Sequence, residues 1–393
     1  MGKKRKIAVY CDSMNNGGTE KATLDLVNNL PADKYDITVI QLEPGGKYQK
    51  QLAGNIKNKE ILPFSPQKNF RFYWWSRRLY EKMPLGLVHK FVIGNKYDVE
   101  IGCGYGYPTR IIQKSKKAKK ISWIHMDVSL DKNYVPSLTK EEGQEYFKNI
   151  DEFVCVSKDC AQKFNQKFGF DDKTKVCYNI VPGKDIQNQS LENTEIKLDK
   201  DKTNIVSIGR LTNQKGFDIL IDAMKPIIEK NKNIKLYIVG EGEGHEDLSK
   251  QIERLSLEEN IVLLGHVSNP YPVLKQADLY VCSSRHESFS LTVAESLILE
   301  VPVVSTRCTG PIELLDNGKY GLLTEHGSED IQKAIELLIE DRDKLCYYKE
   351  MAKKRKKFFD VDNGVKEWEK VLDCILDEEK KIYGKRKNLY DKN

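Results

Sequence analysis

The sequence predicts an α/β protein with two Rossmann-like, doubly wound domains, and three observations support this expectation. The chain has 393 residues, which is long for one hydrophobic core and favours two domains. Short runs rich in valine and isoleucine alternate with helical patterns along most of the chain, as they do in parallel sheets covered by helices. A polar, turn-rich segment at residues 182–204 separates two such series and is the expected linker.

The expected N-terminal domain covers residues 1–185. Its predicted strands are short apolar runs, at residues 6–11, 36–42, 99–104, 120–125 and 152–157. Residues 19–30 and 158–169 carry apolar side chains at helical spacing and predict helices that cover this sheet.

The expected C-terminal domain covers residues 200–362 and repeats the alternation. Its predicted strands are residues 204–210, 235–242, 261–267, 278–284, 301–306 and 321–325. Between them lie four predicted helices, at residues 217–230, 245–257 and 271–277 and in the segment that ends at Leu299. A further helix, residues 363–393, is expected to close the chain.

The net charge of +6 is unevenly divided along the chain. Residues 1–180 hold 31 Lys and Arg against 20 Asp and Glu, a net +11, and the remaining residues hold 33 against 38, a net −5. A basic half implies an anionic partner, such as a phosphorylated lipid or an anionic membrane surface. A nucleic acid is not expected as a partner, because the chain has no zinc-finger, RNP or helix-turn-helix signature.

The cysteines and apolar runs predict a cytoplasmic protein. The nine cysteines include no C-x-x-C pair, and most lie in apolar runs, as reduced core thiols do. The apolar run at the start is too short for a signal peptide, and no window reaches the ~18–20 apolar residues of a spanning helix. Any attachment is therefore expected to be peripheral, at the inner face of the cell membrane. The six histidines lack metal-ligand spacing, so neither a metal nor a cofactor is expected.

The segment FRFYWWSRRLYEKMPLGLVHKF, residues 70–91, combines aromatic side chains with five cations and a single acid. Such a composition suits a membrane interface that contains anionic lipids. The competing hypothesis, which we favour slightly on the sequence, is a helix pair that packs its aromatic side chains into the first domain.

Two glutamates, Glu287 and Glu295, lie in the segment SSRHESFSLTVAESLILEVPVVS. The first is expected in a polar loop after a strand and the second on the following helix, where both carboxylates can address one ligand. Backbone N–H groups at the helix start can face an anion, and carboxylates suit a ligand rich in hydroxyls. A sugar or ribose beside a phosphate satisfies both features, whereas two solvated helix charges are the plainer interpretation.

Three other positions could carry chemistry. Arg210 and Lys215 follow a predicted strand in SIGRLTNQKGF; together they can hold a diphosphate, although solvated loop cations are the alternative. The loop of Asn15, Asn16, Gly17, Gly18 and Thr19 opens a helix and lets backbone approach a ligand, but it is neither G-x-G-x-x-G nor a P-loop. His125 ends a predicted strand at the edge where ligands bind, and a structural role is the competing interpretation.

Together these segments resemble the family-4 glycosyltransferases, retaining nucleotide-sugar enzymes of the GT-B fold, in which two Rossmann-like domains face a central cleft. The likeness covers nearly the whole chain and is strongest from residue 204 to residue 325. It rests on Glu287 and Glu295 with seven residues between them, the R-x-x-x-x-K pair, the VGEGEG turn, the LLGHV segment and the Gly-Gly loop. Family members often have glycine near Ser288 or Ser290.

The resemblance implies a role for each matching residue. Arg210 and Lys215 would bind the donor diphosphate, Glu287 the transferred sugar and Glu295 the ribose. His125 would contact the sugar near the reacting centre, and the closing helix with Trp368 would cross back onto the first domain. The remaining donor contacts would come from Gly17, Gly18, Gly240, Glu241, His266, Val267, Ser288, Phe289, Ser290, Leu291 and Thr292, with His266 and Val267 at the base.

On this resemblance we expect a retaining, metal-independent hexosyltransferase. It would move a hexose from a nucleotide sugar, by default a UDP-sugar, to a glycan acceptor that is expected to be lipid-linked. The setting would be the synthesis of bacterial capsule, exopolysaccharide or another cell-surface polysaccharide. Two alternatives remain open: a nucleotide-sugar epimerase or hydrolase of the same fold, and a non-catalytic partner that binds sugar nucleotides or glycans.

Overall fold

The computed structural model describes residues 3–15, 17–65, 69–128 and 134–390. It divides into two compact units, of which the first contains residues 1–180 and 362–393 and the second contains residues 181–361. The division falls just before the segment expected as a linker. Part of that segment, α8 (Gly183–Gln189), is a helix of the second unit. A short helix among polar residues lacks the apolar periodicity that would have revealed it.

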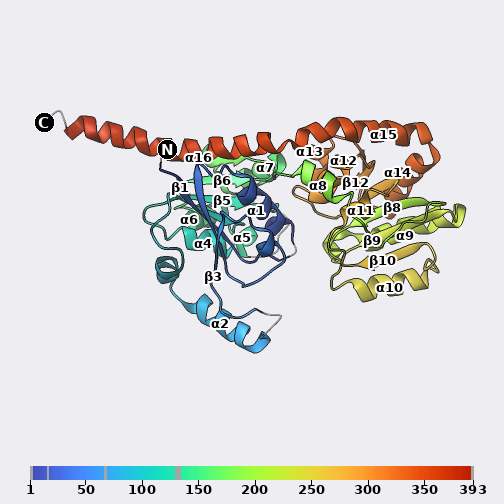
Figure 1. Ribbon diagram of the computed structural model, residues 1–393, viewed down its shortest axis with the longest axis horizontal. Helices are drawn as coiled ribbons and strands as arrows, with labels where there is room; N and C mark the ends of the chain where they lie inside the picture. Colours follow the sequence, from blue (N-terminus) through green and yellow to red (C-terminus); the bar gives the residue numbers. More distant parts are fainter. Residues whose placement is uncertain (1–2, 16, 66–68, 129–133, 391–393) are drawn as a thin grey trace. The chain divides into compact units, whose positions relative to one another are not determined.

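The first unit is built on a seven-stranded parallel sheet (Figure 1). Its strands, in spatial order, are β3 (Lys57–Glu60), β2 (Tyr35–Gln41), β1 (Arg5–Cys11), β4 (Val99–Cys103), β5 (Lys119–Ile124), β6 (Glu152–Cys155) and β7 (Thr174–Val176). The five predicted strands are confirmed. The two edge strands were not predicted, because β3 is the polar and exposed sequence KNKE and β7 has only three residues.

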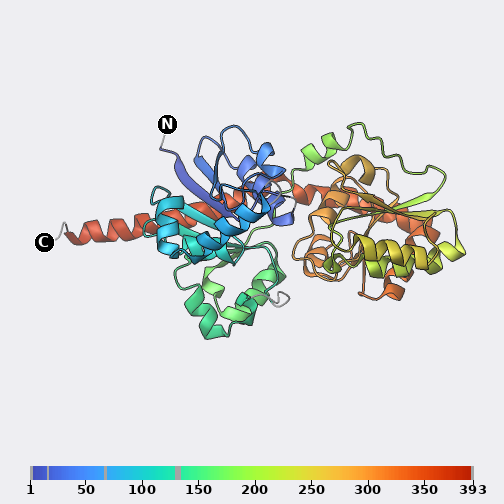
Figure 2. The same cartoon turned by 90° about the horizontal axis from the view of Figure 1, so that it is seen from below.

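Helices cover both faces of this sheet, as Figure 2 shows from a second direction. The helices of this unit are α1 (Gly18–Asn29), α2 (Phe70–Lys82), α3 (Leu85–Val88), α4 (Tyr107–Ile112), α5 (Tyr134–Ser137), α6 (Lys140–Tyr146), α7 (Lys158–Phe168) and α16 (Val361–Tyr390), of which α2 lies at the margin of the unit. Both ends of α7 are set by local chemistry: the Ser157 hydroxyl accepts from the Cys160 N–H, and Gly169 ends the helix in the left-handed conformation.

The last helix, α16, packs on the first unit although it follows the second in sequence. Its Trp368 is fully buried and meets Trp123 of β5 edge to face, with ring centroids 4.9 Å apart. The Lys34 ammonium donates to the Glu369 carboxylate of α16 at 2.6 Å. These contacts place the helix over the amino-terminal sheet.

The second unit has a six-stranded parallel sheet in the order β10 (Ile261–Gly265), β9 (Ile234–Val239), β8 (Thr203–Ile208), β11 (Leu279–Cys282), β12 (Val303–Thr306) and β13 (Leu322–Thr324). All six were predicted. Its other helices are α9 (Phe217–Lys230), α10 (His245–Arg254), α11 (Tyr271–Leu274), α12 (Leu291–Ile298), α13 (Thr309–Leu314), α14 (Ser328–Glu340) and α15 (Arg342–Arg355). The fold class is therefore confirmed: both units are parallel, doubly wound α/β layers.

Each sheet reverses its strand order once, and the reversal positions the candidate site. In the second unit the reversal lies between β8 and β11, where Tyr280 pairs with Val206. In the first unit it lies between β1 and β4, where Tyr10 pairs with Gly102. Ligands of open α/β sheets bind beyond the carboxyl ends of strands at such a reversal.

Candidate functional site

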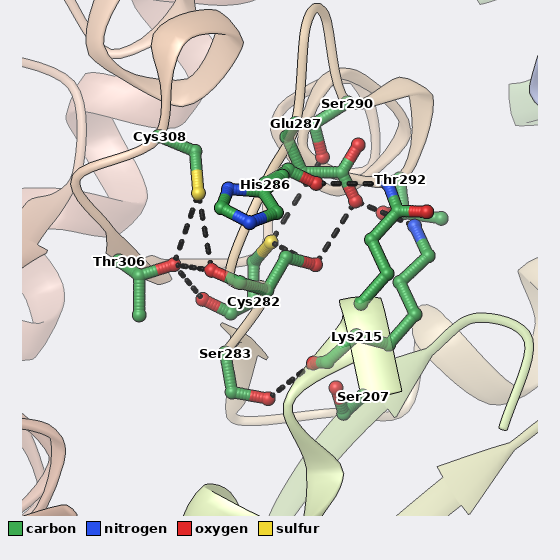
Figure 3. Close-up of polar contacts among 12 residues, drawn as sticks. Ser207, Lys215, Cys282, Ser283, His286, Glu287, Ser290, Thr292, Thr306 and Cys308 are labelled. Carbon is green, nitrogen blue, oxygen red and sulfur yellow. Dashed lines mark hydrogen bonds and ion pairs between the residues drawn. The ribbon is translucent and has the colours of Figure 1, made fainter. Parts of the chain in front are cut away.

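The loops that follow β8 and β11 bring Lys215 and Glu287 together. The Lys215 ammonium lies 2.5 Å from Oε1 of Glu287 (Figure 3). Both side chains are largely buried, with 19% of Lys215 and 10% of Glu287 exposed. The pair therefore joins two motifs that the sequence places 72 positions apart.

Further hydrogen bonds fix the loops after β8 and β11 against each other. Ser284 donates to the same Glu287 oxygen at 2.9 Å, and Ser283 donates to the Lys215 carbonyl at 3.0 Å. Arg285 makes a two-pronged ion pair with Asp218, with N–O distances of 2.8 and 2.6 Å. This ion pair fixes the loop after β11 against the start of α9, the helix that follows the loop after β8.

The pKa of the Lys215 ammonium is raised above its ordinary value. Burial acts to lower the pKa, but the charge and hydrogen bond of Glu287, together with the nearby Cys282, outweigh burial, and the charge of Arg210 opposes the increase. Lys215 is therefore a fixed cation at physiological pH. Arg210 itself is exposed at the carboxyl end of β8, where its guanidinium is accessible to an anionic ligand.

Two glycines permit the close approach of these loops. Gly216 has φ of +64°, and a Cβ atom there would lie 2.2 Å from the Ser283 carbonyl oxygen. Gly240, in the VGEGEG turn, has φ of +147°, and its Cβ would lie 1.9 Å from the Gly209 carbonyl oxygen. Because a side chain would collide with backbone at both places, the contacts between the loops after β8, β9 and β11 require glycine.

Glu295, the second glutamate of the motif, lies on α12 and is 7% exposed. The Tyr271 hydroxyl donates to its Oε1 at 3.0 Å. Ser290 precedes α12 with φ of +69°, in the left-handed region that favours glycine. The serine thus adopts the conformation that glycine would take most readily.

The residues between the two glutamates form the start of α12 and its approach. Phe289 and Ser290 are buried, whereas Ser288, Leu291 and Thr292 are partly exposed. The Thr292 hydroxyl accepts from Tyr280 at 2.7 Å. Gly310 lies so close to Phe289 that a Cβ would meet its carbonyl oxygen at 2.3 Å.

The predicted base-binding residues, His266 and Val267, follow β10 and lie beside Gly240 and Glu241, two predicted donor-binding residues that follow β9. The Gly240 N–H donates to the Gly265 carbonyl at 2.9 Å, and the His266 N–H donates to the Glu241 carboxylate at 3.4 Å. His266 is exposed and Val267 partly exposed. The residues predicted from the second unit therefore lie on α12 or on the loops that follow β8, β9, β10 and β11, at one edge of its sheet.

Two family models match this chain and together span most of it. The model described as Glycosyl transferases group 1 matches residues 188–355, which include both glutamates and the Lys215–Glu287 pair. The model described as Glycosyltransferase Family 4 matches residues 16–182. The chain belongs to the family-4 type of GT-B glycosyltransferases.

Curated relatives of this glycosyltransferase extend over nearly its full length. An uncharacterized glycosyltransferase of Methanocaldococcus jannaschii is 29% identical, with 84% of this chain and 91% of the relative covered. A Campylobacter jejuni enzyme, N-acetylgalactosamine-N,N'-diacetylbacillosaminyl-diphospho-undecaprenol 4-alpha-N-acetylgalactosaminyltransferase, is 27% identical over 91% of this chain and 96% of its own.

Solved structures show the same fold. Anabaena HepE in complex with UDP has a TM-score of 0.71 at 20% identity, covering 94% of this chain and 100% of that one. A glycosyltransferase from Rickettsia africae has a TM-score of 0.76 at 19% identity, covering 95% and 99%. The GT-B fold is therefore confirmed for this glycosyltransferase.

The glycine loop of the first unit lies where the sheet order reverses. Gly17 precedes α1 and Gly18 begins it, with no side chain capping the helix start. A Cβ on Gly17 would lie 2.1 Å from a Glu20 carboxylate oxygen. Asn16 lies outside the described residues. The loop thus leaves helix N–H groups without a side-chain cap at the carboxyl end of β1.

His125 follows β5 and packs against Trp123, with ring centroids 4.2 Å apart and the ring planes tilted by 50°. Its Nε2 is buried and has no hydrogen-bond partner among the described residues. Burial lowers the pKa of the imidazole to about 3, so the ring is neutral at physiological pH. An unpaired, buried nitrogen in a neutral ring can donate or accept one hydrogen bond with a ligand, depending on the tautomer.

Replacing His125 by phenylalanine is expected to reduce the acid sensitivity of the first unit. The unfolded imidazole has a pKa of about 6.5, so the stability that the neutral ring contributes is present above that pH and is lost as pH falls toward 3. Urea midpoints at pH 7.5 and 4.5 should differ less in His125→Phe than in the wild type. Equal differences in both proteins would contradict the buried, neutral assignment.

Several residues of the site had no signal in the sequence. Tyr271, Asp218, Arg285 and Gly310 were not predicted, because each acts through a partner that is distant in the chain. The pairing of Arg285 with Asp218 spans 67 positions and that of Tyr271 with Glu295 spans 24. Among the described residues, no group of three His, Cys, Asp or Glu side chains is arranged to hold a metal ion.

Proposed function

We propose that this glycosyltransferase transfers a hexose from a UDP-sugar to a lipid-linked glycan with retention of anomeric configuration and without a metal ion. The reaction would contribute to a bacterial cell-surface polysaccharide. The observation that carries the proposal is the Lys215–Glu287 pair, a fixed cation and a carboxylate held at the reversal of strand order beside the start of α12.

The donor and acceptor classes are supported by relatives. Anabaena HepE was crystallised with UDP and with UDP-glucose. The Campylobacter jejuni relative is named for a diphospho-undecaprenol-linked acceptor. Rhizobium meliloti and Staphylococcus aureus relatives are named for lipopolysaccharide core and capsular polysaccharide biosynthesis.

In the proposed reaction the bond between the anomeric carbon and the diphosphate oxygen breaks, and the acceptor hydroxyl oxygen bonds to the same face of that carbon. The hydroxyl proton passes to the departing phosphate. Arg210 and Lys215 stabilise the negative charge that develops on the diphosphate. Glu287 holds both Lys215 and the sugar hydroxyls, Glu295 holds the ribose, and His125 offers its unpaired nitrogen to the sugar.

The experiment that tests this function combines binding and turnover. Nucleotide sugars that bind the folded protein should raise its melting temperature, with UDP-sugars ahead of GDP- and ADP-sugars. Release of UDP should then require a glycan acceptor and persist in excess EDTA, and the product should carry the donor's anomeric configuration. UDP release without acceptor would favour a hydrolase, and recovery of an epimeric UDP-sugar an epimerase. Binding without turnover on any acceptor would favour a non-catalytic sugar-nucleotide-binding partner.

Glu295→Gln is expected to reduce the discrimination between UDP and its 2′,3′-dideoxy analogue. A carboxylate that accepts from two hydroxyls loses part of that ability as an amide, and the wild type should favour UDP by about tenfold or more. Dissociation constants for both nucleotides check this expectation. Glu300→Gln is the matched control, because Glu300 lies just beyond α12 and pairs with Lys356 on the protein surface; equal discrimination in wild type and Glu295→Gln would refute the ribose role.

A further inference from the structure

The outer side of α2 carries large apolar side chains that are open to solvent. Trp75 is 63% exposed, Phe70 64%, Leu79 54% and Trp74 44%. The packing hypothesis for this segment is therefore wrong for both tryptophans. In Figure 1 the helix lies at the margin of the first unit, outside the helices that cover the sheet.

The inner side of α2 explains why the helix is nevertheless held firmly. Tyr73 and Tyr80 are buried, and the Tyr80 hydroxyl lies 2.8 Å from that of Tyr10 on β1. Arg77 donates to the Glu43 carboxylate at 2.8 Å. These contacts anchor one side of the helix, whereas the side chains of the opposite side are exposed to solvent.

Three exposed cations, Arg71, Arg78 and Lys82, occupy the middle of the outer side. At about 100° per residue they fall within about 40° of one another, directly opposite the buried tyrosines. Trp74 and Phe70 flank them on one edge, and Trp75 and Leu79 on the other. We call these seven residues the α2 outer face.

The apolar exposure continues beyond the helix. Leu87 is 46% exposed and Phe91 70%. The segment that carries them is fixed to the sheet, because the buried His89 ring lies 2.8 Å from the Glu100 carboxylate of β4. The exposed side chains therefore stand on a supported surface that extends from residue 70 to residue 91.

We propose that the α2 outer face docks onto an anionic lipid bilayer. Tryptophans would enter the boundary between headgroups and acyl chains, while the central cations would meet lipid phosphates. A protein partner fits less well, because a packed interface would have to strip water from three neighbouring exposed cations, whereas lipid headgroups supply phosphates to these cations and leave them hydrated. No helix among the described residues has the length and apolar character to span a bilayer, so docking of this kind would place the enzyme on the surface.

Tryptophan fluorescence provides a direct test on the full-length protein. The chain has four tryptophans; Trp123 and Trp368 are fully buried, so a change on binding vesicles reports on Trp74 and Trp75. We expect a blue shift with vesicles of phosphatidylcholine and phosphatidylglycerol, quenching by brominated acyl chains, and little response to phosphatidylcholine alone. No shift with either vesicle would overturn the proposal.

Substitutions separate the two components of the surface. Replacing Arg71, Arg78 and Lys82 by glutamine should weaken partitioning onto anionic vesicles about 100-fold, and Trp74→Ser with Trp75→Ser about tenfold or more. The control for the cations replaces Lys114, Lys116 and Lys117 by glutamine, which removes the same charge from exposed positions of the same unit. The control for the tryptophans is Tyr347→Ser, which removes an exposed ring. Equal losses in test and control variants would refute a specific face.

Self-association is the competing outcome. The wild type could form a concentration-dependent dimer that the tryptophan substitutions abolish and that vesicles do not dissociate. In that case the α2 outer face is an interface between two copies of the chain, and the lipid proposal fails. Because the vesicle test uses neither donor nor acceptor, its failure leaves the proposed transfer reaction intact. Melting curves without ligand, unchanged from the wild type in every variant, verify that the first unit, which carries the α2 outer face, remains folded.

Discussion

Replacing Lys215 by alanine is expected to lower kcat of this glycosyltransferase by about 100-fold or more, with Arg210→Ala producing a loss of similar size. Preorganised cations at a departing diphosphate stabilise charge that develops in the transition state, and removing one such group typically costs about this much. Initial rates of UDP release with a saturating acceptor provide the measurement. Near-wild-type turnover in both variants would eliminate the proposed site.

Lys356→Ala is the matched control for this prediction. Lys356 also belongs to the second unit and also pairs with a glutamate, Glu300, at 3.1 Å, but away from the reversal of strand order. Its removal should leave turnover unchanged. Melting curves are needed for Lys215→Ala, because that substitution leaves the buried Glu287 carboxylate without its cation; adding Glu287→Gln should restore the melting temperature without restoring turnover.

Trp368→Ala is expected to destabilise the first unit by about 3–5 kcal/mol, since it removes a fully buried indole from the contact between α16 and β5. All four tryptophans lie in the first unit, so denaturation followed by tryptophan fluorescence reports on that unit. The free energy of unfolding should fall accordingly.

Trp75→Ala is the control, with the same chemical change at an exposed position. It should alter the free energy of unfolding by less than about 0.5 kcal/mol. Similar losses in the two variants would mean that α16 contributes no more to the core than a surface residue does.

The predictable part of the fold follows from burial on both faces of a parallel strand. Every strand of the second sheet is a run of valine, isoleucine or leucine, a pattern that composition reveals directly. The edge strand β3 escaped prediction because it has no apolar residue, and α8 because seven polar-rich residues show no period. Such elements are stabilised by contacts with neighbours that are distant in sequence, and no local sequence pattern encodes these contacts.

The same distinction applies to the site. Glu287, Glu295, Arg210 and Lys215 could be predicted as site residues because each lies in a loop or helix that follows a recognisable strand. That Lys215 would pair with Glu287 could not be predicted, since it depends on β8 and β11 becoming neighbours across 72 positions of chain. The exposure of Trp74 and Trp75 likewise depends on which side of α2 meets the sheet.

The return of the chain to its first unit has a consequence for synthesis on the ribosome. The second unit is one continuous segment, residues 181–361, and can fold as soon as it has emerged. The first unit begins earlier yet lacks α16, so the indole of Trp123 remains uncovered until Trp368 is synthesised after the second unit. The part made first is thus completed last, and a nascent chain interrupted before α16 would expose an aromatic surface to chaperones.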